Sequence, residues 1–167
     1  MFQIGESVLY GIHGVCDIIG SEEQTVDRKH VTYLILEPVG QPGSRYMVPM
    51  HNAAAMGKLK RMLTREELEC MMRSEQVYKD CWIQDEGQRK QKYRELINSG
   101  EREKLMGMVH TLYGHKAELA AAGRKIHLCD DNFLRDAEKI LMGEISVIMN
   151  MDMDEAKQFI RTALKNP

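Results

Sequence analysis

The pattern of hydrophobic and polar positions changes near residue 60. Before that point, short apolar runs at 7–10, 15–19, 31–36 and 45–50 are separated by glycine and proline. Runs of this length between turn residues are typical of strands in a small antiparallel sheet or barrel. Pro49 cannot donate a hydrogen bond to a neighbouring strand, so we expect its strand at a sheet edge, or the strand to end there.

After residue 60, apolar residues recur every three or four positions, which predicts amphipathic helices. Thr64 and Glu67 have the spacing of a capping box, in which each side chain accepts a hydrogen bond from the other residue's amide. Further helices are predicted from about 85 to 97, from about 105 to Gly123, from 131 to 149 and from 152 onward. The chain is therefore predicted to be α+β, with a β domain over residues 1–60 and an all-α bundle of five helices over residues 61–167.

The composition is that of a soluble globular protein. The chain has 167 residues, of which 43% are hydrophobic and 29% charged, so extensive disorder is not expected. No stretch of 18 apolar residues and no secretory signal is visible, which predicts a cytoplasmic protein without a membrane span. The net charge of -2 disfavours a generally basic nucleic-acid-binding protein, but it allows a local basic patch.

The sequence offers no recognisable catalytic or metal-binding motif. The four cysteines form no CxxC pair, and the six histidines are scattered. Phosphate-binding glycine loops, serine-nucleophile motifs and the HExxH zinc motif are also absent from the sequence. Acidic pairs at 130–131 and 152–154 fall at predicted helix starts, where carboxylates complement the helix dipole. We therefore expect no enzyme activity, no cofactor and no metal.

Two neighbouring features are suited to recognising a partner. Trp82, the only tryptophan, lies in a polar segment between two predicted helices, where it is either a buried plug or an exposed wedge. Six basic and three acidic residues follow between 88 and 104, a local charge of +3. Such a run is either a solvated helix face or a phosphate-binding surface. An aromatic ring beside several cations is the combination that contact with DNA requires.

Several segments of the chain resemble a known family. Residues 2–15 follow the pattern FxIGExVxYGxHGV, and later matches occur in order at YLIL (33–36), YMVP (46–49), Asn52, Trp82, Arg89, Tyr93, SG (99–100), LY (112–113) and AEKIL (137–141). This order of motifs resembles the CarD/CdnL family of bacterial transcription regulators over nearly the whole chain.

The resemblance implies a fold and a function. The N-terminal part would be a Tudor/SH3-like β domain, shared with the transcription-repair coupling factor, that binds the RNA polymerase β subunit partly by adding a strand to a sheet. The helical part would contact the minor groove of promoter DNA at the upstream edge of the bubble and stabilise the open complex. The protein is expected to act as a monomer. The alternative is a module that bridges RNA polymerase to a second protein without DNA contact.

The resemblance also implies site residues. Those facing polymerase would be Glu23, Gln24, Thr25, Val26, Arg45, Tyr46 and Met47. Those facing DNA would be Trp82 as the wedge, Arg89, Lys90 and Lys92 on phosphate, and Arg124 and Lys125 as a second contact. Family members often carry arginine at the positions of Gln24 and Met47, so this polymerase contact is expected to be less charged. From the residues alone, the polar stretch 21–30 also fits an ordinary hairpin with no partner.

Overall fold

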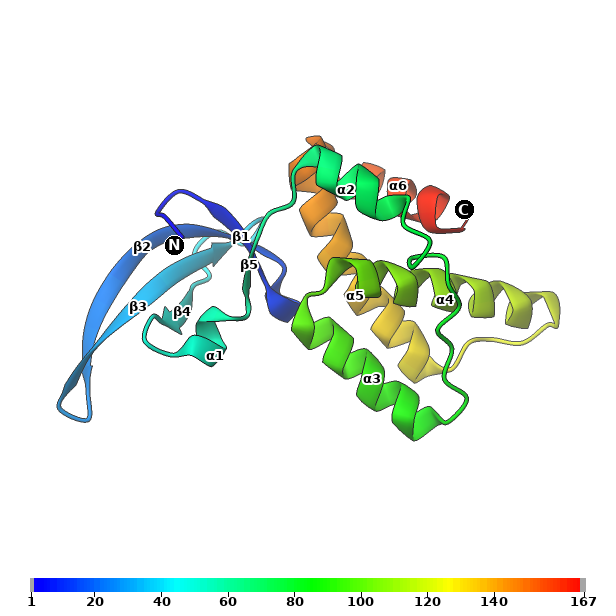
Figure 1. The fold of residues 1–167 in the computed structure, drawn as a ribbon, viewed down its shortest axis with the longest axis horizontal. Coiled ribbons are helices and arrows are strands. Elements are labelled where there is room, and N and C mark those ends of the chain that lie inside the picture. The colour runs from blue at the N-terminus through cyan, green and yellow to red at the C-terminus, as the bar shows by residue number, and fades with distance from the viewer. Residues whose placement is uncertain (1, 166–167) are drawn as a thin grey trace. The chain divides into compact units, whose positions relative to one another are not determined.

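The chain divides into two compact units, Met1–Met62 and Leu63–Pro167, and each is described by itself. The structure is a computed structural model that describes residues 2–165. Strands fill the first unit and helices fill the second (Figure 1). The predicted α+β layout is therefore confirmed.

The first unit, the β unit, is built on one antiparallel sheet of five strands in the order β4-β3-β2-β1-β5. The strands are β1 (Ser7–Tyr10), β2 (Val15–Val26), β3 (Lys29–Pro38), β4 (Tyr46–Pro49) and β5 (Leu59–Arg61). A 3-10 turn, η1 (Gly11–His13), joins β1 to β2, and a short helix, α1 (Ala53–Met56), lies between β4 and β5. The periodicity of the sequence indicated the first four strands but neither α1 nor β5.

Pro49 is the last residue of β4, and β4 is an edge strand. Both parts of the expectation for this proline are met, because its missing N–H limits how far the strand can pair. The sheet thus ends at a strand of four residues.

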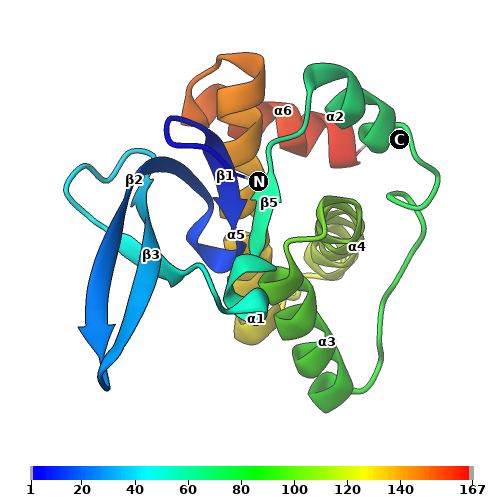
Figure 2. The same ribbon diagram turned by 60° about the vertical axis from the view of Figure 1, so that its left-hand side comes forward.

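Strands β2 and β3 continue as a long two-stranded hairpin beyond the ends of their neighbours (Figures 1 and 2). β1 pairs only with the Val15–Asp17 part of β2, and β4 pairs only with Tyr33–Leu36 of β3. The turn residues Asp27 and Arg28 both have positive φ, 51° and 62°. Two successive left-handed residues match the right-handed twist of a hairpin. The polar stretch 21–30 is therefore a hairpin.

A compact set of apolar side chains from all five strands forms the core of the β unit. They are Val8, Cys16, Ile18, Leu34, Leu36, Val48 and Leu59. Between Ile18 and Gly20 the register of β2 against β3 shifts by one residue. A one-residue bulge reverses which residues face the core. After Ile18, the alternation of β2 is therefore reversed, and residues 19–26 are exposed or half-buried.

The described part of the second unit, the helical unit, has five helices. They are α2 (Arg65–Met72), α3 (Glu86–Ser99), α4 (Arg102–Ala121), α5 (Leu128–Met149) and α6 (Met153–Lys165). The capping box before α2 is confirmed, since Thr64 Oγ1 accepts from Glu67 N at 3.1 Å and Glu67 Oε2 accepts from Thr64 N at 2.9 Å. Helix α5 packs against α3, α4 and α6 (Figure 1). None of the helices within residues 2–165 has the length and apolarity needed to cross a membrane.

A buried ion pair ties the start of the helical unit to its longest helices. Arg102 Nη2 on α4 lies 2.8 Å from Glu144 Oε1 on α5, and the two side chains are 10% and 3% exposed. The backbone N–H of Leu63 donates to the same carboxylate at 3.3 Å. Because a buried carboxylate needs partners for its oxygens, Glu144 fixes both α4 and the first residue of this unit.

We expect Cys16 to resist alkylation while the protein is folded. Its side chain is fully buried, and burial raises the pKa of its thiol to about 11. Cys70 and Cys81 are exposed. Because the thiolate is the reactive form, iodoacetamide at pH 8 should label these two first, and labelling of Cys16 should increase as the pH approaches 11. Peptide mass spectrometry measures this, with urea-unfolded protein as the control. Equal labelling of Cys16 and Cys70 in folded protein at pH 8 would contradict it.

Candidate functional site

Trp82 lies on the segment that joins α2 to α3, and its ring is half-buried. The ring stacks on the imidazole of His115 from α4, with centroids 3.4 Å apart and planes inclined by 25°. The guanidinium carbon of Arg89 lies 4.2 Å from the centroid of the same ring. Trp82 is therefore held in place by two helices of its own unit while part of its ring stays accessible.

The segment carrying Trp82 is fastened along one face of α4. The N–H of Cys81 donates to Thr111 Oγ1 at 3.1 Å, and the Trp82 ring meets His115 one helical turn further on. Residues four apart lie on the same helix face. The N–H of Trp82 itself donates to Asp80 Oδ1 at 3.0 Å. The backbone before the ring is thus fixed as well as the ring.

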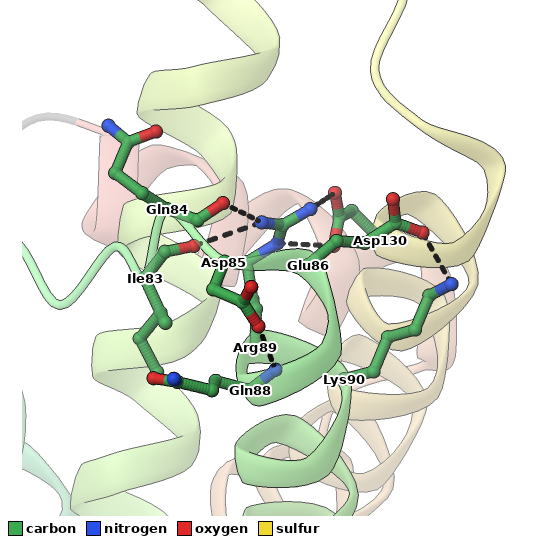
Figure 3. A network of polar contacts seen from close by, with 8 residues as sticks. All are labelled: Ile83, Gln84, Asp85, Glu86, Gln88, Arg89, Lys90 and Asp130. Atoms are coloured by element: carbon green, nitrogen blue, oxygen red, sulfur yellow. Dashed lines mark hydrogen bonds and ion pairs between the residues drawn. The ribbon is translucent and has the colours of Figure 1, made fainter.

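Arg89 is buried inside the helical unit and forms an ion pair with Asp130 of α5 (Figure 3). Its Nε and Nη2 donate to the two carboxylate oxygens, each at 2.9 Å. Its Nη1 donates to the carbonyl oxygens of Ile83 and Gln84, at 2.9 and 3.3 Å. The hydrogen bond with Asp130 raises the pKa of Arg89. The planar guanidinium fork matches a carboxylate in two-point contact.

This position differs from the expected phosphate contact at Arg89. The side chain is only 6% exposed, and Nε, Nη1 and Nη2 all donate within the protein. A guanidinium held this way cannot also neutralise a phosphate in solution. Arg89 instead joins the carbonyl groups that follow Trp82 to the first turn of α5, which makes it a positioning residue for the tryptophan.

Helix α3 begins four residues after the tryptophan. Asp85 is its N-cap, and its Oδ1 accepts from Gln88 N at 2.7 Å (Figure 3). Such a cap satisfies one of the free amides of the first turn. The cap fixes where the basic run of α3 starts relative to Trp82.

The remaining predicted DNA-facing cations lie at the surface. Lys90 pairs with Glu86 on the same helix (Figure 3), and this hydrogen bond raises the pKa of Lys90. Lys92 is exposed and lines a hollow of about 280 Å³ together with Cys81, the neighbour of Trp82. Arg124 and Lys125 are exposed on the loop between α4 and α5 and line a second hollow of about 450 Å³. No ion pair joins Lys92, Arg124 or Lys125 to a described residue.

Sequence reasoning missed His115, whose ring covers part of Trp82. His115 is seven residues after Met108 and four before Leu119, so it lies at the border of the predicted apolar face of this helix. A histidine at that border is the signal in the sequence, and nothing there indicates which segment covers it.

In the β unit, three of the predicted polymerase-facing residues share one face of the sheet. Gln24 pairs with Val31, and Met47 pairs with Ile35. Because Val31 and Ile35 are four residues apart on β3, their side chains lie on the same face, and so do those of Gln24 and Met47. Val26, two residues after Gln24, follows the same alternation. The Nε2 of Gln24 lies 3.9 Å from the Sδ of Met47. Two residues that are 23 positions apart in the sequence are thus brought together on one face.

The other predicted residues of this set lie elsewhere. Tyr46 packs against the core, and its ring lies 4.2 Å from that of His13 and 5.9 Å from that of Tyr10. Glu23 and Thr25 are exposed on the opposite face from Gln24, and Arg45 is exposed just before β4. No described strand pairs with the outer edge of β4. This edge therefore offers free backbone groups beside Met47.

The described residues have the features of a binding surface. Within residues 2–165, no three His, Cys, Asp or Glu side chains gather as metal ligands. An open sheet edge and a fixed surface tryptophan are features of an interaction protein. Residues 2–60 match the family model of the CarD-like/TRCF RID domain. Domains of this family are interaction modules that bind the RNA polymerase β subunit. The match confirms the CarD-like resemblance over the β unit.

We expect Arg89→Met to destabilise the helical unit by about 3–5 kcal/mol, because it leaves Asp130 charged and buried without its partner. The matched control is Arg94→Met on the same helix, an exposed arginine, which should change the free energy of unfolding by less than about 0.5 kcal/mol. Urea unfolding followed by circular dichroism measures both. Replacing both partners, as Arg89→Met with Asp130→Leu, should recover most of the loss. Equal stability of the two single variants would contradict the structural role of Arg89.

Proposed function

We propose that this protein is a transcription regulator that binds the RNA polymerase β subunit through its β unit and promoter DNA through its helical unit. Contact at the upstream edge of the bubble would stabilise the open complex. The observation that carries the proposal is the match of residues 2–60 to the CarD-like/TRCF RID domain. The DNA part rests on the geometry around Trp82.

The polymerase contact is proposed for the outer edge of β4 and the adjoining face that carries Gln24 and Met47. An edge strand can pair its free N–H and C=O groups with a strand of a partner. Met47 is 39% exposed and Val26 is 42% exposed, so the face adds apolar area beside the backbone pairing. Pro49 ends the pairing, because it has no N–H to donate.

The DNA contact is proposed for the accessible part of the Trp82 ring and the cations around it. Apolar wedges unstack a base step in the minor groove, and cations nearby neutralise phosphates. Lys90, Lys92, Arg124 and Lys125 supply this charge at the surface. Arg89 holds the ring and its segment in place from inside. The stacked imidazole of His115 limits how the ring can tilt, which favours insertion by its exposed edge.

Tethering compensates for the small number of DNA contacts. A few phosphate contacts give weak, salt-sensitive affinity, with roughly one log unit of salt slope per contact. Binding to polymerase raises the effective concentration at the promoter, and linked sites generally gain about 10²–10⁴ in avidity. The tryptophan shifts the equilibrium toward open DNA only by its preference for the distorted junction over closed duplex.

We expect Trp82→Ala to shorten the lifetime of open complexes on a melting-limited promoter while polymerase binding stays intact. Loss of about 1 kcal/mol of ring–base contact corresponds to a lifetime about fivefold shorter. Trp82→Phe, which keeps an aromatic ring, should retain part of the effect. Lifetimes are measured after competitor challenge with the cognate polymerase. If the wild-type protein binds polymerase but neither it nor the variant changes the lifetime, the protein-bridging alternative is favoured.

We expect Met47→Asp to weaken binding to RNA polymerase at least about tenfold, because the carboxylate would be desolvated against the partner strand. The matched control is Val39→Asp, which changes another exposed apolar residue of the β unit, 48% exposed, away from β4. Biolayer interferometry on immobilised polymerase compares the two, and circular dichroism checks folding. Equal loss in both variants would remove the assignment of the β4 edge.

A further inference from the structure

A groove in the helical unit, apart from the two hollows described above, is lined by α4, α5 and α6 and has a volume of about 520 Å³. Five of its lining side chains are cationic and two are acidic. The cations are Lys116, Arg135, Lys157, Arg161 and Lys165, and the acids are Asp131 and Glu138. The groove therefore carries a surplus of three positive charges in a protein whose net charge is -2.

This groove is separate from the site around Trp82. Ala117 of α4 lines the groove, whereas His115 contacts the tryptophan. Two residues along a helix are about 200° apart around its axis. The groove therefore opens on the side of α4 that faces away from the tryptophan. It adjoins the hollow of Arg124 and Lys125, because Lys116, Ala120 and Asp131 line both.

The two carboxylates of the groove already have partners. Asp131 accepts from both Lys116 Nζ, at 2.8 Å, and Arg135 Nη2, at 2.7 Å, and these contacts lower its pKa. Glu138 accepts a short hydrogen bond from the hydroxyl of Tyr113. Both acids are thus held as acceptors inside the protein. One of the three surplus charges remains beside Asp131, which has two cationic partners, and the other two remain on the α6 side, where three cations face Glu138.

Two cations from α6 are held loosely. Arg161 Nε is 3.6 Å from Glu138 Oε1, and this buried N–H has no hydrogen-bond partner among the described residues. Lys157 is half-buried and forms no ion pair with a described residue. Arg89 and Arg102, by contrast, are locked by carboxylates at 2.8–2.9 Å. An unpaired buried N–H is costly, so an anion that reoriented Arg161 would supply the missing acceptor.

The size and lining of the groove indicate the kind of anion. Leu134, Ala117 and Ala120 contribute apolar atoms to its lining, and Lys165 Nζ lies 5.3 Å from the centroid of the Tyr113 ring, which also lines the groove. A volume of this order fits a small organic molecule. We propose that the groove binds a phosphate-bearing ligand of nucleotide size, with its phosphates on Lys157 and Arg161 and its apolar part against Leu134, Ala117 and Ala120. The phosphate can come from a free nucleotide or from a flexible single strand.

Isothermal titration calorimetry of the full chain at low salt tests this proposal. The three probes are ATP, inorganic pyrophosphate and a short single-stranded oligonucleotide. Lys157→Glu is expected to weaken binding at least tenfold for whichever of these probes the wild-type protein binds. The matched control is Lys139→Glu, the same charge change at an exposed position of α5 outside the groove lining, which should change the affinity less than twofold. Lys157→Gln serves if the glutamate variant fails to fold.

The outcomes distinguish a free nucleotide from a single strand as the source of the phosphate, and they distinguish the groove from the tryptophan contact. Binding of ATP that Trp82→Ala leaves unchanged identifies a free-nucleotide site. Binding of the oligonucleotide alone, sensitive to Lys157→Glu and indifferent to Trp82→Ala, identifies a single-strand site. No saturable binding by any probe, or equal losses at Lys157 and Lys139, would overturn the proposal. None of these readouts depends on polymerase, so they stand whether or not the proposed function holds.

Discussion

The buried ion pair of Arg89 with Asp130 is the interaction on which the arrangement around Trp82 depends. Taking a guanidinium and a carboxylate out of water is costly, and the cost is offset only when geometry and further hydrogen bonds are good. Here the ion pair is bidentate, and the remaining nitrogen, Nη1, donates to the carbonyl oxygens of Ile83 and Gln84, which follow the tryptophan. The same guanidinium lies by the indole ring. One side chain therefore fixes α3 on α5 and sets where the ring can be.

A different constraint governs the β unit. Edge strands expose unpaired backbone groups and invite unwanted pairing. Here the edge strand β4 has four residues and ends in Pro49, so it offers a short stretch of backbone to a partner. The hairpin of β2 and β3 places Gln24 beside Met47 and adds side-chain area to that edge. A short edge strand beside a defined side-chain face favours binding of a specific partner over non-specific edge-to-edge pairing of strands.

Most elements were predictable from local patterns, and the exceptions have physical reasons. The capping box at Thr64 and the edge position of Pro49 follow from the chemistry of those residues alone. β5 has three residues and α1 has four, too few to show a period. The turn at Asp27 and Arg28 lacks the glycine that usually marks two left-handed residues.

The candidate site was predictable only in part, because its decisive contacts join distant residues. Arg89 looked like its basic neighbours in the sequence, and its partner lies 41 positions away. His115 is 33 positions from Trp82, and no local pattern links them. The basic run therefore predicted where positive charge is concentrated, while tertiary partners decided which cations stay available.

Whether a basic residue of this protein can bind an anionic ligand depends on whether the fold already pairs it with a carboxylate. Arg89 and Arg102 are paired in the interior with Asp130 and Glu144, so their charge is neutralised where they hold helices together. Lys92, Arg124 and Lys125 lie at the surface, and Lys157 is half-buried, none with an ion pair to a described residue. Charge that the fold has not neutralised is available to a ligand at little structural cost. Lys92 lies with the segment that carries Trp82, whereas Arg124, Lys125 and Lys157 line two adjoining hollows that share Lys116, Ala120 and Asp131. The positive charge that the fold leaves available is therefore concentrated beside α4 at the ends of distant segments, which no local sequence pattern brings together.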